Sequence, residues 1–286
     1  MPTTLSVATP AGHGLAASLY MPSQSPKKAV LIAPATGIGR RFYHAFAEYL
    51  AGEGYGVLSF DFQGVGDSLA GRLRDCPASL VSWGTNDLSA ALDELARQFP
   101  RATYHLIGHS AGGQLPGLMP NAARLSSLLA VAGSSGRLAN MPASYRPRAE
   151  LFMRAVIPVS NALTGVSRTD LVGMGGPLPR EAGAQWARWC LGRGYVETGF
   201  GREVQEHCYD TLDIPSLWLN ASDDEIAVNA NVDDMVRVFS RMAPRAEKRT
   251  LVPAEHGLGS IGHMGFFKRS SQVLWPIAAE WLARQA

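Results

Sequence analysis

Residues 104–107 form a short, largely apolar run that leads directly into the sequence Gly-His-Ser-Ala-Gly at residues 108–112. A strand that breaks into Gly-x-Ser-x-Gly and continues as a helix forms a nucleophile elbow, a strained turn from which the serine hydroxyl projects. The two outer glycines carry no Cβ, so the strand and the helix can cross closely. The first N–H groups of the helix and its positive dipole end point back toward the serine. This feature predicts a strand–turn–helix unit with the hydroxyl of Ser110 exposed on the turn.

Apolar runs of strand length alternate with segments of helical spacing over most of the chain. We expect strands at residues 3–9, 15–21, 29–33, 55–62, 104–107, 125–132, 216–220 and 248–252, and helices at 42–51, 86–99, 231–242 and 272–284. Such alternation implies a mostly parallel sheet with helices on both faces. The first two strands, joined by a short turn, supply an antiparallel edge. The predicted fold class is therefore α/β.

The alternation stops between residues 136 and 211, a stretch rich in Arg, Pro, Trp and Met without a buried-strand pattern. We interpret residues 136–211 as an inserted, largely helical cap, and residues 1–135 and 212–286 as the core domain. A chain of 286 residues is long enough for one domain with such an insertion. The apolar side chains of the cap either line a substrate pocket or pack as a small core of their own: Met141, Leu151, Phe152, Met153, Ile157, Met174, Trp186 and Trp189.

Composition limits which binding partners and which cellular compartment we expect for this chain. The formal net charge is only +2 and no long basic tract occurs, so nucleic acid is not an expected partner. Cys76, Cys190 and Cys208 are widely spaced and odd in number, which favours thiols in a reducing compartment over a disulfide framework or a zinc site. No signal-peptide pattern and no membrane-length apolar stretch is visible. We expect a cytoplasmic protein without a membrane partner, a cofactor or a metal, and leave the oligomeric state open between a monomer and a homodimer.

A serine nucleophile needs a base to take its proton and an acid to orient that base. In folds with such an elbow the acid follows the serine in the chain and the histidine comes last. Directly after the strand at residues 216–220, the chain carries three consecutive carboxylates, Asp223, Asp224 and Glu225. Asp224 is the preferred acid from its spacing behind the strand, followed by Asp223 and then Glu225. The alternative is a solvated acidic turn without a catalytic role.

Two histidines, His256 and His263, follow the last expected strand, and both adjoin a glycine. His263 precedes the apolar residues 264–267, which can anchor its loop against the core and hold the imidazole still. The pattern therefore favours His263 over His256 as the base. His109 adjoins Ser110 in the sequence, but we expect its side chain to point away or to line the pocket.

An oxyanion formed by attack of Ser110 on a carbonyl needs two backbone donors. One is expected to be the N–H of Ala111, the first residue after the serine. The other is expected in the loop after the strand at residues 29–33. Pro34 has no N–H, so either Ala35 or Thr36 must donate.

The same loop also suggests a different class of protein, one that binds a dinucleotide. Residues 36–39, Thr-Gly-Ile-Gly, follow a buried strand, but Phe42 stands where the third glycine of Gly-x-Gly-x-x-Gly belongs. Asp61 opens the run Asp-x-Gln-Gly-x-Gly-x-Ser at residues 61–68, which we interpret as a structural turn capped by the aspartate. We therefore expect no nucleotide cofactor.

The chain resembles an α/β-hydrolase over almost its whole length. The resemblance rests on the elbow at residues 108–112, the turn at residues 61–68, the acidic loop at residues 223–225 and the pair Gly262-His263, in the order of that family. It implies the α/β-hydrolase fold, a mostly parallel sheet with helices on both faces and an inserted helical cap. It also implies hydrolysis by a Ser–Asp–His triad.

Two departures from the family pattern stand out. The family often has His-Gly where this chain has Ala33-Pro34, which bears on the second oxyanion donor, and often has Arg where Gln63 stands. Residues 42–43, 186–190 and 261–267 are further similar to a bacterial group of predicted α/β-hydrolases with no assigned substrate. That similarity supports His263 and adds little about the chemistry.

The sequence predicts a carboxylesterase-like serine hydrolase that cleaves an ester, thioester or amide of a small acyl group. His263 would deprotonate Ser110, Asp224 would orient His263, and water would release the acid from the acyl-enzyme. Two other classes remain open. An acyltransferase would use the same triad with an alcohol or amine as acceptor, and a non-catalytic binding protein of this fold would need none of these residues.

Overall fold

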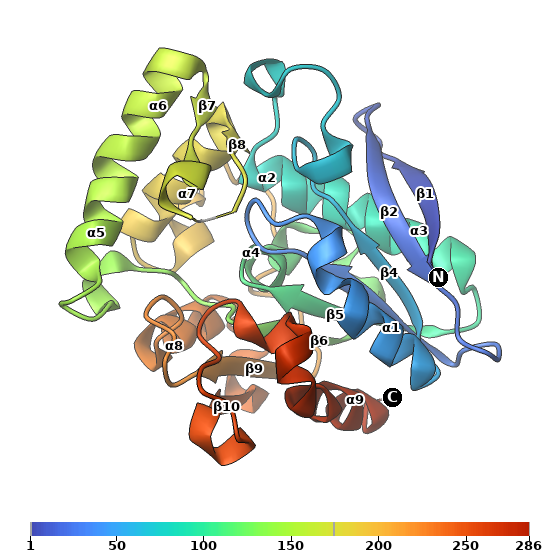
Figure 1. Ribbon diagram of the computed structural model, residues 1–286. Coiled ribbons are helices and arrows are strands. Elements are labelled where there is room, and N and C mark those ends of the chain that lie inside the picture. The colour runs from blue at the N-terminus through green and yellow to red at the C-terminus, as the bar shows by residue number, and fades with distance from the viewer. Residues whose placement is uncertain (1, 174, 286) are drawn as a thin grey trace.

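The computed structural model describes residues 2–173 and 175–285. Its centre is an eight-stranded sheet with the strand order β1-β2-β4-β3-β5-β6-β9-β10 (Figure 1). The strands are β1 (Thr3–Ala8), β2 (Gly14–Tyr20), β3 (Lys28–Ala33), β4 (Gly56–Phe60), β5 (Thr103–His109), β6 (Leu125–Val131), β9 (Ser216–Ala221) and β10 (Glu247–Leu251). β2 pairs antiparallel with β1 and β4, and the other neighbours in this sheet run parallel. The predicted α/β class with an antiparallel N-terminal edge is confirmed.

Helices cover both faces of this sheet because its inner strands are apolar on both sides. Along β3, Val30 and Ile32 belong to one apolar cluster with residues of α1 (His44–Gly52) and α9 (Trp275–Ala283). Ala29 and Leu31 belong instead to the cluster that contains residues of α3 (Ser89–Gln98) and α8 (Asn229–Val238). This alternation is the period of two of a β-strand. Each fully buried aliphatic side chain of this kind stabilises the fold by about 1.5–3 kcal/mol.

The starts of two helices show which local features override the apolar spacing. The helix expected at residues 86–99 starts at α2 (Leu80–Ser82), where Ser79 and Ser82 cap each other's N–H groups. A π-helical stretch, Trp83–Leu88, then joins α2 to α3. The helix expected from residue 272 begins at Trp275, since a proline at one of its first two positions suits a helix start. Caps and proline therefore set these boundaries more strongly than the apolar period.

The segment between β6 and β9 forms a separate group of helices beside the sheet (Figure 1). It contains α5 (Arg146–Leu151), a π-helical stretch (Phe152–Val156), α6 (Ile157–Thr164) and α7 (Arg180–Leu191). We call residues 136–211 the helical segment. It also holds a short antiparallel pair, β7 (Val166–Ser167) with β8 (Leu178–Pro179), in which Ser167 and Leu178 are fully buried. The expectation of no buried strand in this segment is thus wrong by one two-residue pair.

The end of the helical segment packs on the core. The N–H of Cys208 donates to the carbonyl oxygen of Gly117 at 2.7 Å. The hydroxyl of Tyr209 donates to the backbone carbonyl oxygen of Gln114, also at 2.7 Å. Both acceptors belong to the chain just after Ser110, which includes α4 (Ala111–Gln114). The division into a core and a cap at residue 211 stays a prediction. In the described part of the chain, no helix combines the length and apolarity that crossing a bilayer requires.

The turn after β4 has the structural role predicted for it. The carboxylate of Asp61 accepts the N–H of Asp67 at 3.0 Å, and the hydroxyl of Ser68 donates to the carbonyl oxygen of Asp61 at 2.7 Å. The guanidinium of Arg40, buried beside it, pairs with the same carboxylate. Asp61 is itself buried, so these bonds satisfy a charge that has left water.

Candidate active site

Ser110 stands between β5 and α4 with φ 47° and ψ −110°, a conformation that costs a non-glycine residue energy. A Cβ built on Gly108 would lie 2.3 Å from the backbone of Gly112. A Cβ built on Gly112 would lie 2.2 Å from the carbonyl oxygen of Ala33. Only glycine fits at both positions, so the strand and the helix cross as closely as the motif predicts. The serine side chain stays partly exposed at this crossing.

Asp224 and His263 form a hydrogen-bonded pair beside the elbow. Nδ1 of His263 lies 2.8 Å from a carboxylate oxygen of Asp224, whose side chain is fully buried. The other carboxylate oxygen accepts the N–H groups of Ile226 and Ala227 at 2.8 and 2.9 Å. Burial raises the pKa of Asp224, but the charge and hydrogen bond of His263, with the two N–H groups, outweigh it and leave the pKa below its ordinary value. The carboxylate is thus held in its charged form against the imidazole.

The other two carboxylates of this loop lie in different surroundings. The side chain of Asp223 accepts the N–H groups of Ile261 and Gly262, each at 2.9 Å, and so holds the loop that carries His263. Glu225 is exposed. The structure therefore places Asp224 against the imidazole of His263, and Asp223 against the backbone N–H groups of the two residues before it, Ile261 and Gly262.

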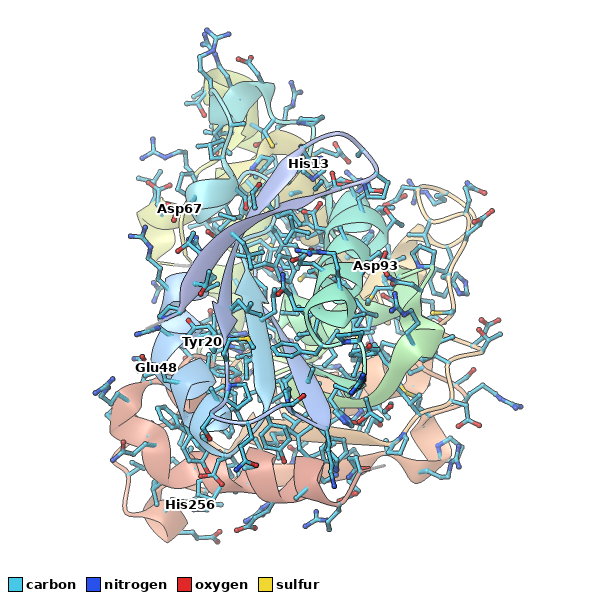
Figure 2. The ribbon with its side chains drawn as sticks, turned by 90° about the vertical axis from the view of Figure 1, so that its right-hand side faces the viewer. His13, Tyr20, Glu48, Asp67, Asp93 and His256 are labelled. Carbon is cyan, nitrogen blue, oxygen red and sulfur yellow. The ribbon has the colours of Figure 1, made fainter. Side chains whose placement is uncertain are left out.

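His256 lies away from this pair. It ends a 3-10 turn, Pro253–His256, and Figure 2 shows it at the periphery of the molecule. It lines neither of the cavities that border Ser110. Of the two histidines considered as the base, only His263 shares a cavity with the serine.

Ser110 and His263 line the same cavities, yet no hydrogen bond joins their side chains within the described residues. Nucleophile–base contacts are often long in unliganded enzymes and tighten when a substrate binds. The site thus contains two parts that border the same cavities. One is His263, held by a buried carboxylate, and the other is Ser110 in its strained conformation. These are the parts that nucleophilic catalysis requires.

The candidate oxyanion donors differ in how they are used. The N–H of Ala35 donates to the hydroxyl of Tyr43 at 2.8 Å. Within the described residues, no hydrogen bond engages the N–H of Thr36 or of Ala111. Ala35 and Thr36 both line a cavity with Ser110, and Ala111 follows Ser110 at the start of α4. Thr36 and Ala111 are thus the two predicted donors that the fold leaves available.

Tyr43 and His109 form a buried pair next to Ser110, and the sequence did not predict their contact. The hydroxyl of Tyr43 lies 2.8 Å from Nδ1 of His109, and Nε2 of His109 lies 2.9 Å from the carbonyl oxygen of His263. Tyr43 and His109 are both fully buried. The side chain of His109 therefore points away from the cavities, one of the two orientations expected for it. A histidine inside a strand end is the signal that could have marked this pair.

Two adjoining cavities border Ser110 and His263. The smaller compartment has a volume of about 50 Å³, and the larger has about 300 Å³. The smaller is lined by Ser110, Gln114, Gly136, Met141, Tyr145, Arg148, Ala149, Phe152, Met153, Trp186, Cys190, Ile226 and His263. The larger is lined by Ala35, Thr36, Ile38, Ser110, Tyr145, Arg148, Gly173, Gly175, Trp186, Ile226, His263 and Met264. Both are mainly apolar, and the helical segment supplies much of the wall of each.

The apolar residues predicted for the helical segment divide into three groups. Four of them, Met141, Phe152, Met153 and Trp186, line the smaller compartment. Ile157 and Trp189 are buried but border neither compartment, and Leu151 is 63% exposed. Met174 lies outside the described residues. Part of the apolar surface therefore faces the site, and part packs elsewhere.

The model of the alpha/beta hydrolase family matches residues 30–272 of the chain. The chain belongs to that family. A search of the curated proteins finds no match. Within the described residues of this hydrolase, no group of three or more His, Cys, Asp or Glu side chains is arranged to hold a metal ion.

Solved structures agree with the fold of this hydrolase. A soluble variant of the monoglyceride lipase from Saccharomyces cerevisiae, solved with a substrate analogue, matches with a TM-score of 0.68 and 13% identity over 99% of this chain and 95% of its own. An esterase from Pyrococcus furiosus matches with a TM-score of 0.63 and 14% identity, over 100% of this chain and 91% of its own. The esterase domain of a Rhodothermus marinus protein matches with a TM-score of 0.61 and 19% identity, over 100% of this chain and 99% of its own. At these identities the likeness concerns the fold.

Proposed function

We propose that this hydrolase is a serine carboxylesterase that acts through an acyl-enzyme on Ser110. One observation carries the proposal. The strained serine of the elbow borders the same cavities as a histidine that a buried carboxylate holds at 2.8 Å. In this mechanism His263 takes the proton of Ser110 and then returns it to the leaving alcohol, and Asp224 stabilises the imidazolium. Water, activated by the same imidazole, then releases the carboxylic acid.

The oxyanion of the tetrahedral intermediate would be held by the N–H groups of Ala111 and Thr36. Neither group has another acceptor among the described residues, whereas the N–H of Ala35 is engaged by Tyr43. Preorganised backbone donors of this kind are typically worth about 10²–10³ in rate each. They also cost no reorganisation during the reaction, since the fold holds them in place.

The unequal compartments support a short acyl chain, in line with the small acyl substrate expected from the sequence. The smaller one, about 50 Å³, offers much less room than the larger one, about 300 Å³. We assign the acyl chain to the smaller compartment. We assign the alcohol to the larger compartment of about 300 Å³, which has more room for a group that must leave before water attacks. The helical segment, which contributes Phe152 and Trp186 to these walls, would then act as the cap that selects the substrate.

The compartment of the cell is part of the same proposal. Cys76, Cys190 and Cys208 are all free thiols in the structure. Free thiols suit a reducing environment such as the cytoplasm. A small acyl ester would be the partner of the site, and the proposal needs no metal, cofactor or nucleic acid.

A fluorophosphonate probe tests the nucleophile directly, because it reacts with activated serines. We expect intact-protein mass spectrometry to show one adduct on the wild type, and peptide mapping to place it on Ser110. Ser110→Ala should lose the adduct and the hydrolysis of p-nitrophenyl acetate while keeping the wild-type circular dichroism spectrum. A folded wild-type protein that takes up no probe, or an adduct on another residue, would contradict the proposal.

A further inference from the structure

A chain of buried hydrogen bonds runs beneath the candidate site. The N–H of Ala35 donates to the hydroxyl oxygen of Tyr43 at 2.8 Å. That hydroxyl lies 2.8 Å from Nδ1 of His109, and Nε2 of His109 lies 2.9 Å from the carbonyl oxygen of His263. Tyr43 and His109 are fully buried, so no water competes for these bonds.

The chemistry of the groups fixes the direction of every bond in this chain. A backbone N–H can only donate, so the Tyr43 oxygen accepts from Ala35 and its own O–H donates to Nδ1 of His109. A carbonyl oxygen can only accept, so Nε2 of His109 carries the proton and donates to His263. Burial, with a smaller effect from His263, lowers the pKa of His109 to about 3, which keeps its imidazole neutral near pH 7. One tautomer therefore satisfies every donor and acceptor.

The chain connects three segments that lie far apart in the sequence. Ala35 precedes Thr36 in the loop after β3, and His109 directly precedes Ser110. The carbonyl group of His263 belongs to the residue whose imidazole meets Asp224. The ring of Phe267 packs against both members, with centroids 4.9 Å from those of Tyr43 and of His109.

We propose that Tyr43 and His109 are positioning residues of the esterase, an inference that rests on the function proposed above. Together they hold the second oxyanion donor, the nucleophile and the base at fixed separations. Tyr43 also decides which N–H is left for the oxyanion, because it engages Ala35 and leaves the adjacent Thr36 available. A displacement of about 1 Å in such an arrangement can cost about 100-fold in rate.

A purely structural network predicts a different outcome from a positioning one. Loss of a structural bond lowers stability, and thereby the fraction of active molecules, without altering each active molecule. Loss of a positioning bond lowers kcat per active site and weakens transition-state binding, with little effect on KM. Fluorophosphonate titration counts the active sites. A trifluoromethyl ketone, which forms a tetrahedral adduct with an oxyanion, reports transition-state binding.

The decisive variant is Tyr43→Phe, which removes the hydroxyl and keeps the ring. We expect kcat per titrated site for p-nitrophenyl acetate to fall about 10- to 100-fold, with KM within twofold of wild type. The Ki of the trifluoromethyl ketone should rise by a similar factor. Tyr55→Phe is the matched control, because Tyr55 is also buried in the same apolar cluster and donates one hydrogen bond, to Ala279 at 3.1 Å. It should match wild type in all three measurements.

A second pair of variants tests the other half of the chain. His109→Gln keeps a side-chain N–H that can reach the carbonyl oxygen of His263, whereas His109→Leu removes it. We expect the Gln variant to retain more kcat per titrated site than the Leu variant. Equal kcat for Tyr43→Phe, Tyr55→Phe and wild type would overturn the inference while leaving the esterase proposal intact. A wild type that takes up no probe would overturn both, since positioning requires a reacting Ser110.

Discussion

The carboxyl edge of the sheet and the helical segment beside it meet at the same cavities, but different interactions hold them. At the edge, directional hydrogen bonds fix the side chains of the candidate active site. Asp224 accepts two backbone N–H groups and contacts His263, and His109 is bonded at both ring nitrogens. The helical segment presents mainly apolar side chains to the same space, such as Phe152 and Trp186.

Apolar contacts specify volume, whereas hydrogen bonds specify position and orientation. Changes at the edge should therefore alter the rate of the chemical steps. Changes in the helical segment should alter which substrate fits, because apolar walls tolerate substitution when the shape changes little. The predictions below test this contrast, beginning with the largest expected effect.

The acidic loop offers the strongest test at the edge. Asp224→Asn should lower kcat for p-nitrophenyl acetate by about 10⁴-fold, because an amide neither stabilises the imidazolium nor holds the same histidine tautomer. Steady-state kinetics of the purified variant, normalised to folded protein, measure the effect. The side chain of Asp224 is fully buried, so solvent cannot compensate for the negative charge that the substitution removes.

The adjacent carboxylate supplies the control. Asp223→Asn keeps one acceptor oxygen for the N–H groups of Ile261 and Gly262, and the side chain is exposed. We expect a loss of about tenfold or less, through a looser His263 loop. If the two variants lose equal activity, the assignment of Asp224 as the orienting acid is wrong.

Enlarging the smaller compartment should change chain-length preference without stopping the reaction. Met141→Ala removes three heavy atoms from its wall, room for about three more carbons of an acyl chain. The ratio of kcat/KM for p-nitrophenyl pentanoate to that for the acetate should rise about tenfold, in the range typical of apolar pockets.

Leu163→Ala is the matched control for this change. Leu163 lies on α6 of the same helical segment, is 80% exposed and lines neither compartment. Its chain-length profile should coincide with that of wild type. A profile that shifts equally in both variants, or in neither, would contradict the assignment of the acyl chain to the smaller compartment.

A change of pH should act on the stability of the fold rather than on activity, through the buried histidines of β5. Burial lowers the pKa of His105 to about 4 and that of His109 to about 3. The unfolded chain takes up these protons near pH 6.5 and the folded protein does not, so the free energy of unfolding falls as the pH drops below about 6.5. The loss is at most about 1.4 kcal/mol per pH unit for each histidine. Urea unfolding at pH 7 and pH 5 measures it.

His105→Asn should show a smaller loss between these two pH values than wild type. His44→Gln, at a position whose side chain is 42% exposed, should show the wild-type loss. Unfolding free energies that are the same at pH 7 and pH 5 in the wild type would mean that His105 and His109 do not couple protonation to the stability of the sheet.

Several features of this protein could be predicted because they depend on neighbouring residues. The elbow follows from two glycines and a serine within five positions, and Ser110 has the φ of 47° that this pattern requires. Inner strands such as β3 and β4 were recognisable as runs buried on both faces. The start at Leu80 was hidden, since it depends on a reciprocal cap between Ser79 and Ser82 rather than on apolar spacing.

The choice among neighbouring candidates depended on contacts between distant parts of the chain. Spacing behind the strand ranks Asp224 ahead of Asp223, but only the approach of the loop at residues 261–263 gives the two adjacent aspartates different partners. The hydrogen bonds from Ala35 through Tyr43 to His109 likewise join separate segments, and no repeating pattern in the sequence marks these residues as neighbours. The sequence alone therefore determined the fold class and the position of the serine, because both rest on local sterics and burial. Tertiary structure decided which carboxylate, which histidine and which N–H groups meet there, because loops from four strands converge on one edge of the sheet.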